Sequence, residues 1–188
     1  TMLLITLAAG ALVAACASGP QVRADADPSA NLTSYKTFGF FEDLATDKSS
    51  YTTMLTSRLK ASIQRELEAR GYKMVAADPQ LLVNFNVNVA DRMNVESSPG
   101  VGGYGYYGYR AGAYGMWAGY PQDVHTTHYQ EGTLAIDLVD AQKRQLVWQG
   151  VAEGRINKSA LENPSAAVDK VVTEIFAKYP VKSSAAAP

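Results

Sequence analysis

The chain has 188 residues, of which 47% are hydrophobic and 19% charged; this is ordinary for one folded domain and excludes a wholly disordered chain. Its 17 Lys and Arg residues and 18 Asp and Glu residues give a net charge of −1, so the basic excess typical of nucleic-acid-binding proteins is missing. One cysteine and two histidines exclude a disulfide framework and a multi-cysteine zinc site, and we expect no metal and no cofactor.

An apolar segment opens the chain, and residues 3–15 are almost wholly apolar or small. A helix of about 13 residues rises roughly 20 Å, short of the ~30 Å hydrocarbon core, so a signal peptide fits better than a transmembrane helix. Val13, Ala14 and Ala15 precede Cys16, the single cysteine, and this order resembles a bacterial lipobox. No Lys or Arg precedes the apolar run, which departs from the usual signal.

The lipobox resemblance implies how the protein is anchored. Residues 1–15 would be removed as a lipoprotein signal peptide, and Cys16 would carry a diacylglycerol and an amide-linked fatty acid such as palmitate. Several acyl chains, each worth about 0.8 kcal/mol per buried CH₂, anchor a protein stably. Residue 17 is Ala rather than Asp, which in the enterobacterial sorting pattern implies the inner leaflet of the outer membrane, with the domain facing the periplasm. A buried structural cysteine is the alternative, which the polar, Pro- and Ala-rich sequence after Cys16 disfavours.

The segment after the cysteine has little to build a core with. Residues 16–30 hold one larger aliphatic residue, Val22, and are predicted to be the lipidated cysteine and a flexible tether. The folded domain is then expected over residues 31–180. Its first strand is predicted at residues 35–41, which are short and rich in aromatic side chains.

A stripe of apolar residues predicts an amphipathic helix over residues 51–70. The stripe recurs every four residues, at Leu55, Leu59, Ile63 and Leu67. The candidate N-caps are Asp47, Ser49 and Ser50. Gly71 follows the helix where a left-handed residue belongs, and Tyr72 is expected to pack back on Leu67.

Residues 81–89 alternate between apolar and polar side chains, which predicts a strand with one buried face. The polar face carries Asn84, Asn86 and Asn88. These three residues form either a binding ladder or, as the more ordinary alternative, the solvated face of an antiparallel sheet.

A hairpin is predicted in the second half of the chain. Residues 133–139 form one strand, which could also start as early as Val124. Residues 140–144 form the loop. Residues 145–156 return as the partner strand, with Gly150 and Gly154 marking candidate bulges.

Asn163 as N-cap and Pro164 as the first helical residue predict a second helix, which Pro180 ends; residues 181–188 form a small-residue tail that we expect to fray. The order strand–helix–strand–strand–strand–helix predicts the α+β class, with one mixed, mostly antiparallel sheet and two helices packed on one face. The residues predicted to be buried together are Leu59, Ile63, Phe85, Val87, Ile136, Leu138, Val172 and Phe176.

Residues 99–121 are a long Gly- and Tyr-rich loop between two predicted strands. The loop lacks the Lys-Ser/Thr ending of a phosphate-binding loop. Aromatic rings on a Gly-rich backbone can form an adaptable binding surface for a glycan, an envelope protein or the membrane interface. The candidates for that surface are Tyr106, Tyr107, Tyr109 and Trp117. A low-complexity insertion without function is the alternative.

Catalytic chemistry is not visible in the sequence. His125 and His128 are three residues apart in a predicted strand, so they point to opposite faces and do not suggest a shared metal. Glu131, Asp137 and Asp140 are single carboxylates for which solvated or hairpin-capping roles suffice.

Several of these segments together resemble the DUF4136 family of bacterial envelope lipoproteins. The resemblance covers residues 31–180 and is most specific in EGTLAIDLVDAQKRQLVWQG, residues 131–150. It implies an α+β domain behind a lipidated Cys16 and supplies no catalytic residues. We therefore expect a lipid-anchored, periplasm-facing envelope lipoprotein that acts as a non-enzymatic binding or scaffolding module. The alternative is an uncharacterised enzyme that acts on cell-wall or lipid material.

Overall fold

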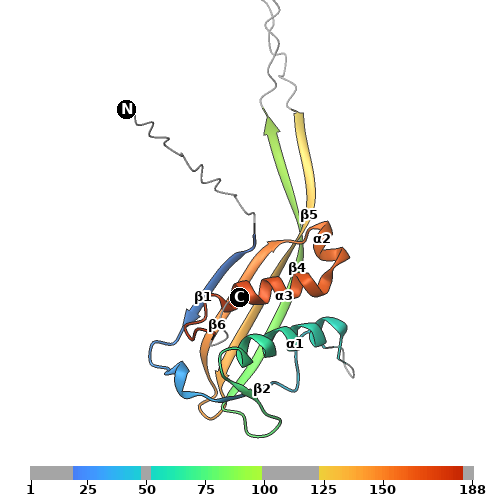
Figure 1. Cartoon of the computed structure of the whole chain (residues 1–188). Coiled ribbons are helices and arrows are strands. Elements are labelled where there is room, and N and C mark those ends of the chain that lie inside the picture. The colour runs from blue at the N-terminus through green and yellow to red at the C-terminus, as the bar shows by residue number, and fades with distance from the viewer. Residues whose placement is uncertain (1–18, 48–51, 99–122, 184–188) are drawn as a thin grey trace, which may run out of the picture.

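The computed structural model describes residues 19–47, 52–98 and 123–183 (Figure 1). Six strands form one open sheet in the order β1-β6-β5-β4-β2-β3. The strands are β1 (Gln21–Ala26), β2 (Thr37–Phe40), β3 (Lys73–Met74), β4 (Leu81–Ser98), β5 (Asp123–Asp140) and β6 (Gln145–Arg155). The helices are the 3-10 turn η1 (Leu32–Ser34), α1 (Met54–Glu68), α2 (Lys158–Glu162) and α3 (Pro164–Phe176).

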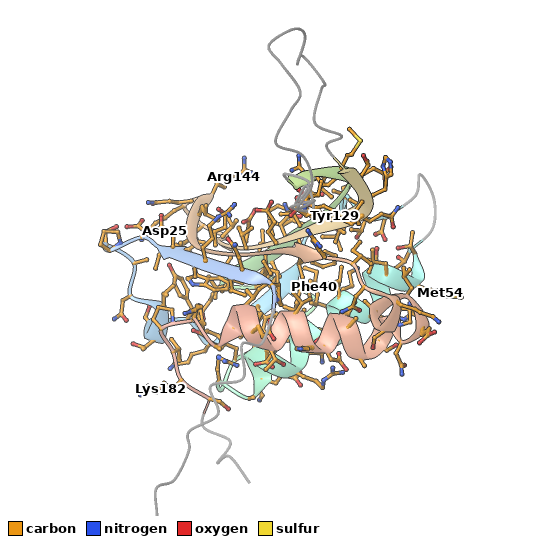
Figure 2. The ribbon with its side chains drawn as sticks, turned by 90° about the horizontal axis from the view of Figure 1, so that it is seen from above. Asp25, Phe40, Met54, Tyr129, Arg144 and Lys182 are labelled. Atoms are coloured by element: carbon orange, nitrogen blue, oxygen red, sulfur yellow. The ribbon has the colours of Figure 1, made fainter. Side chains whose placement is uncertain are left out.

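The sheet is mixed and mostly antiparallel, which confirms the predicted α+β class. β1, β6, β5 and β4 pair antiparallel in that order, whereas β2 pairs parallel with both β4 and β3. Helices α1 and α3 lie side by side on one face of the sheet, as both views show (Figures 1 and 2). In the described part of the chain, no helix is long and apolar enough to span a bilayer.

The prediction of a flexible tether over residues 16–30 is wrong for β1. Gln21–Ala26 pairs with β6 from Glu153 to Trp148, and Val22 and Ala26 pack against the core. No sequence pattern marks this strand, because only two of its side chains need to be apolar. The edge of β6 makes residues 21–26 a strand, since an unpaired row of backbone N–H and C=O groups offers a template for a further strand.

β4 extends well beyond its predicted limit, because the apolar alternation that marks it stops at Val89, whereas β5 begins at Asp123, one residue before the early start considered at Val124. The two strands pair in register from Leu81 opposite Asp140 to Ser98 opposite Asp123. We call residues 91–98 and 123–130 the arm. Among the described residues, no third strand pairs with the arm, which continues past the rest of the sheet (Figure 1).

The ends of α1 combine one confirmed and one wrong prediction. Gly71 has a φ of 87°, its N–H donates to Glu68 at 2.9 Å, and the N–H of Tyr72 donates to Leu67 at 3.2 Å. These are the two bonds of a Schellman motif, so the predicted stop is confirmed. At the start, the side chain of Thr53 accepts from the N–H of Thr56, so Asp47 is not the cap; Ser49 and Ser50 lie outside the described residues.

The second predicted helix begins at Pro164, as expected, but Asn163 makes no side-chain capping bond. The short helix α2 precedes it and was not predicted; Asn157 caps α2 by accepting from the N–H of Ala160. Arg70 ties α1 to α3, because its guanidinium donates to the carbonyl of Phe176 at 2.9 Å and pairs with Glu66 at 2.6 Å.

The predicted core is confirmed at seven of eight positions, and Val87 is only partly buried. Gly150 is not a bulge: a Cβ there would lie 2.4 Å from Cγ2 of Ile175 and 2.5 Å from the ring of Trp148. The glycine therefore lets α3 and the indole lie against β6. The irregularity in the β5–β6 ladder falls instead between Leu138 and Val139.

Candidate functional site

The sheet face without helices is polar, as predicted. Asn86 and Asn88 are exposed and Asn84 is half-buried. Neighbouring strands add polar side chains that bind one another: the amide of Gln149 donates to Asp137 at 2.8 Å, and Arg23 pairs with Glu153 at 3.7 Å. These polar side chains are what the solvated face of an antiparallel sheet is expected to carry.

Cross-strand pairs on this same face brace the base of the arm. Arg92 donates from Nε to Glu131 at 2.8 Å. The guanidinium of Arg155 lies 3.9 Å from the ring centroid of Tyr129, in a cation–π contact. Tyr129 lies on the side of the sheet away from α3 (Figure 2). These pairs join β4, β5 and β6 at the point where β6 ends.

The opposite face of the arm forms an open groove of about 530 Å³ with α2. Asp91, His128, Gln130, Ile156 and Leu161 contribute to its lining. Gln130 donates from its amide to Asp91 at 3.2 Å. The groove therefore combines hydrogen-bonded polar side chains of β4 and β5 with aliphatic side chains from the segment after β6.

Large apolar side chains are exposed around this groove. Val89, Met93 and Leu161 expose 50%, 61% and 63% of their surface. Val89 and Met93 continue the face of β4 that carries Phe85, which is why they lie on the helix side of the sheet. Their exposure arises because the helical layer ends before the arm does (Figure 1).

A hydrogen-bonded pair with shifted pKa values, Asp140 and Tyr35, stabilises the hairpin between β5 and β6. Asp140 is buried and accepts from the backbone N–H groups of Gln142 and Lys143 at 3.0 and 2.8 Å and from the hydroxyl of Tyr35 at 2.8 Å. The hydrogen bond from Lys143 is the largest of the interactions that hold the pKa of Asp140 below its usual value. Burial, and then the bond to Asp140, raise the pKa of Tyr35 to about 12. Asp140 thus has the hairpin-capping role expected of it.

The residues singled out in the sequence fall mostly outside the described part of the chain. Cys16, Tyr106, Tyr107, Tyr109 and Trp117 all do. The structure nevertheless places the two residues that flank the Gly- and Tyr-rich segment, because Ser98 pairs with Asp123 at the far end of the arm.

His125 and His128 lie three residues apart on β5. Within the described residues, no group of three or more His, Cys, Asp and Glu side chains is arranged to hold a metal ion. The groove beside α2 was missed, because neither Met93 nor Leu161 belongs to a periodic pattern that would mark it.

Comparison with known proteins decides the family. Residues 22–181 match the family described as "Domain of unknown function (DUF4136)". The chain belongs to the DUF4136 family. A comparison with curated proteins returned no match.

Two solved structures share the fold. A DUF4136 family protein from Bacteroides thetaiotaomicron aligns with a TM-score of 0.51 and 16% identity, over 87% of this chain and 97% of its own. A PDZ domain protein from Parabacteroides distasonis aligns with a TM-score of 0.55 and 12% identity over 88% of this chain. This chain spans only 38% of the length of that protein. Identities this low show the fold alone.

Proposed function

We propose that this DUF4136 protein is an envelope lipoprotein, held by lipidated Cys16 in the inner leaflet of the outer membrane and facing the periplasm. The observation that carries the proposal is the position of the fold relative to the Val-Ala-Ala-Cys order. The first strand begins at Gln21, and the first residue that packs on the core is Val22. The family match begins at the same point. A folded domain that starts directly after the cysteine is what cleavage before Cys16 would require.

We propose further that the domain is a binding or scaffolding module rather than an enzyme. The buried carboxylate of Asp140, whose pKa is lowered, accepts from two backbone N–H groups and from Tyr35 and so caps a hairpin. Among the described residues, the arm and the groove at its base offer an exposed surface that mixes polar and apolar side chains. Tyr106, Tyr107, Tyr109 and Trp117 belong to the segment that joins the two strands at the end of the arm. Their rings would stack on a glycan or on another envelope protein.

Metabolic labelling with an alkyne fatty acid tests the anchor. The wild-type chain should be labelled and cleaved, whereas Cys16→Ala should remain an unlabelled precursor. Ser18→Ala is the matched control, since it changes a neighbouring residue and keeps the cysteine. Equal labelling of Cys16→Ala and wild type would refute Cys16 as the lipid site.

Chemical crosslinking in intact cells tests the aromatic surface. Changing Tyr106, Tyr107, Tyr109 and Trp117 together to Ser should reduce the crosslinked partner strongly, because each ring contributes about 0.5–1.5 kcal/mol. The control changes Ala111, Ala113 and Ala118 to Ser in the same segment. Both variants should melt near the wild-type temperature. Unchanged crosslinking of the folded aromatic variant would eliminate this surface.

A further inference from the structure

The chain enters the fold at a fixed point. Pro20 lies directly on Gly154 of β6, where an added Cβ would come within 3.1 Å of the Cα of Pro20, and Gln21 then pairs with Glu153. Cys16 precedes Pro20 by four residues. Even fully extended, four residues reach only about 14 Å.

The arm leaves the domain at the same end. Gly154 pairs with Gly132 of β5, which pairs with Val89 of β4, so these residues mark the level at which the chain enters. β4 continues from Val89 to Ser98, nine residues further, which is about 30 Å at ~3.4 Å per residue. β1 begins on the side from which the arm projects (Figure 1).

β4 therefore projects past the level at which the chain enters by about twice the reach of the connection to Cys16. A bilayer that holds Cys16 cannot lie beyond the end of the arm, because the connection is too short to reach it. Inserting the whole arm into the hydrocarbon is also unfavourable, because the exposed Asp91 and Arg92 at its base would carry charge into it. An arm that lies along the interface satisfies both limits.

The side chains on the helix side of the arm and around its base suit such a position. Val89, Met93 and Leu161 expose large apolar surfaces, and His128 and Asp91 lie between them in the groove beside α2. A surface that mixes apolar and polar side chains matches the headgroup boundary of a bilayer, where apolar groups are buried and polar groups stay hydrated.

We propose that the short connection from Cys16 holds the arm end of the domain against the lipid surface, with Val89, Met93 and Leu161 facing the headgroups. The inference rests on the proposed anchoring at Cys16. It adds the orientation of the domain and a second, non-covalent contact with lipid.

Site-specific photo-crosslinking in cells tests the contact. A benzophenone amino acid replaces Met93 in the full chain, or Met74 as the matched control. Met74 exposes 48% of its surface and pairs with Phe38, at the other end of the sheet. Acylation is measured in the same samples with an alkyne fatty acid. We expect position 93 to form adducts with radiolabelled phospholipid several-fold more often than position 74.

Lengthening the connection between Cys16 and Pro20 tests whether its short reach causes the lipid contact. Inserting 16 Gly and Ser residues after Ser18 adds roughly 50 Å of reach and should reduce lipid adducts at position 93 to the level at position 74. Three outcomes in an acylated protein would overturn this inference and leave the proposed anchor standing. They are equal lipid adducts at positions 93 and 74, adducts at position 93 with protein instead of lipid, and no effect of the insertion. Loss of acylation in the wild type would overturn the proposed anchor and this inference with it.

Discussion

The phenolic oxygens of Tyr72 and Tyr179 lie 2.8 Å apart in the core, although 107 residues separate the two in the chain. The oxygen of Tyr72 also lies 2.8 Å from the carbonyl oxygen of Leu32, which can only accept. Tyr72 therefore donates to Leu32, and Tyr179 donates to Tyr72. This relay ties the segment after α3 to the end of α1 and to η1. Burial is the largest cause that raises the pKa of both phenols.

The direction of this relay predicts unequal effects of two similar substitutions. Tyr72→Phe leaves both the Leu32 carbonyl and the Tyr179 hydroxyl without a partner, and should cost about 1–3 kcal/mol of unfolding free energy. Tyr179→Phe leaves the bond from Tyr72 to Leu32 intact, and should cost about 0.5–1.5 kcal/mol. Urea denaturation followed by circular dichroism measures both. A larger cost for Tyr179→Phe would reverse the assigned direction.

Gly150→Ala should destabilise the domain because its Cβ would overlap Ile175 and Trp148. Overpacking of this kind costs typically about 1–3 kcal/mol. Gly19→Ala is the control, since nothing lies within 4 Å of a Cβ at Gly19. In the double variant with Ile175→Ala, the total loss of unfolding free energy should be smaller than the sum of the single losses. Additive losses would show that the two sites do not contact each other in this way.

The pKa of Tyr35 makes stability depend on alkaline pH. The pKa rises from 10.0 to about 12 on folding, so the unfolded chain loses this proton first. The stabilisation is complete below pH 10 and is lost as the pH rises toward about 12. Urea midpoints measured from pH 8 upward should therefore fall more steeply for wild type than for Tyr35→Phe. Parallel curves would contradict the assignment.

Burial predicts opposite outcomes for two aliphatic side chains. Ile136 is fully buried, and Ile136→Ala should cost about 2–5 kcal/mol. Leu161 is 63% exposed, and Leu161→Ala should change the unfolding free energy by no more than about 0.5 kcal/mol. The same denaturation assay compares the two. A large cost for Leu161→Ala would show that α2 supports the fold and is not a free surface.

Local patterns predicted the parts of the fold whose neighbours lie close in the chain. The stripe from Leu55 to Leu67 and the glycine after it identified α1 and its end. Alternation identified the part of β4 that touches the helices. Both patterns record burial of one face, so they stop where burial stops. That is why the prediction for β4 ended at Val89, although the strand continues to Ser98.

The candidate functional surfaces also differ in whether a local sequence pattern reveals them. Cys16 and the aromatic segment are visible in the sequence because their composition is unusual. The groove beside α2 is not, because it forms only where β5 passes the segment after β6.

By itself the sequence determined the class of the fold, most of its core and the Val-Ala-Ala-Cys order on which the proposed anchor rests, because periodicity and residue order are local properties of the chain. Only the tertiary structure decided that β1 joins β6, that Pro20 rests on Gly154, and that the arm projects from the end where the chain enters. These relationships depend on which strand edge is free and how far each strand runs past its neighbour. β1 and β6 are more than a hundred residues apart in the chain, and the length of the arm depends on where β6 stops pairing with β5, so neither relationship leaves a local pattern.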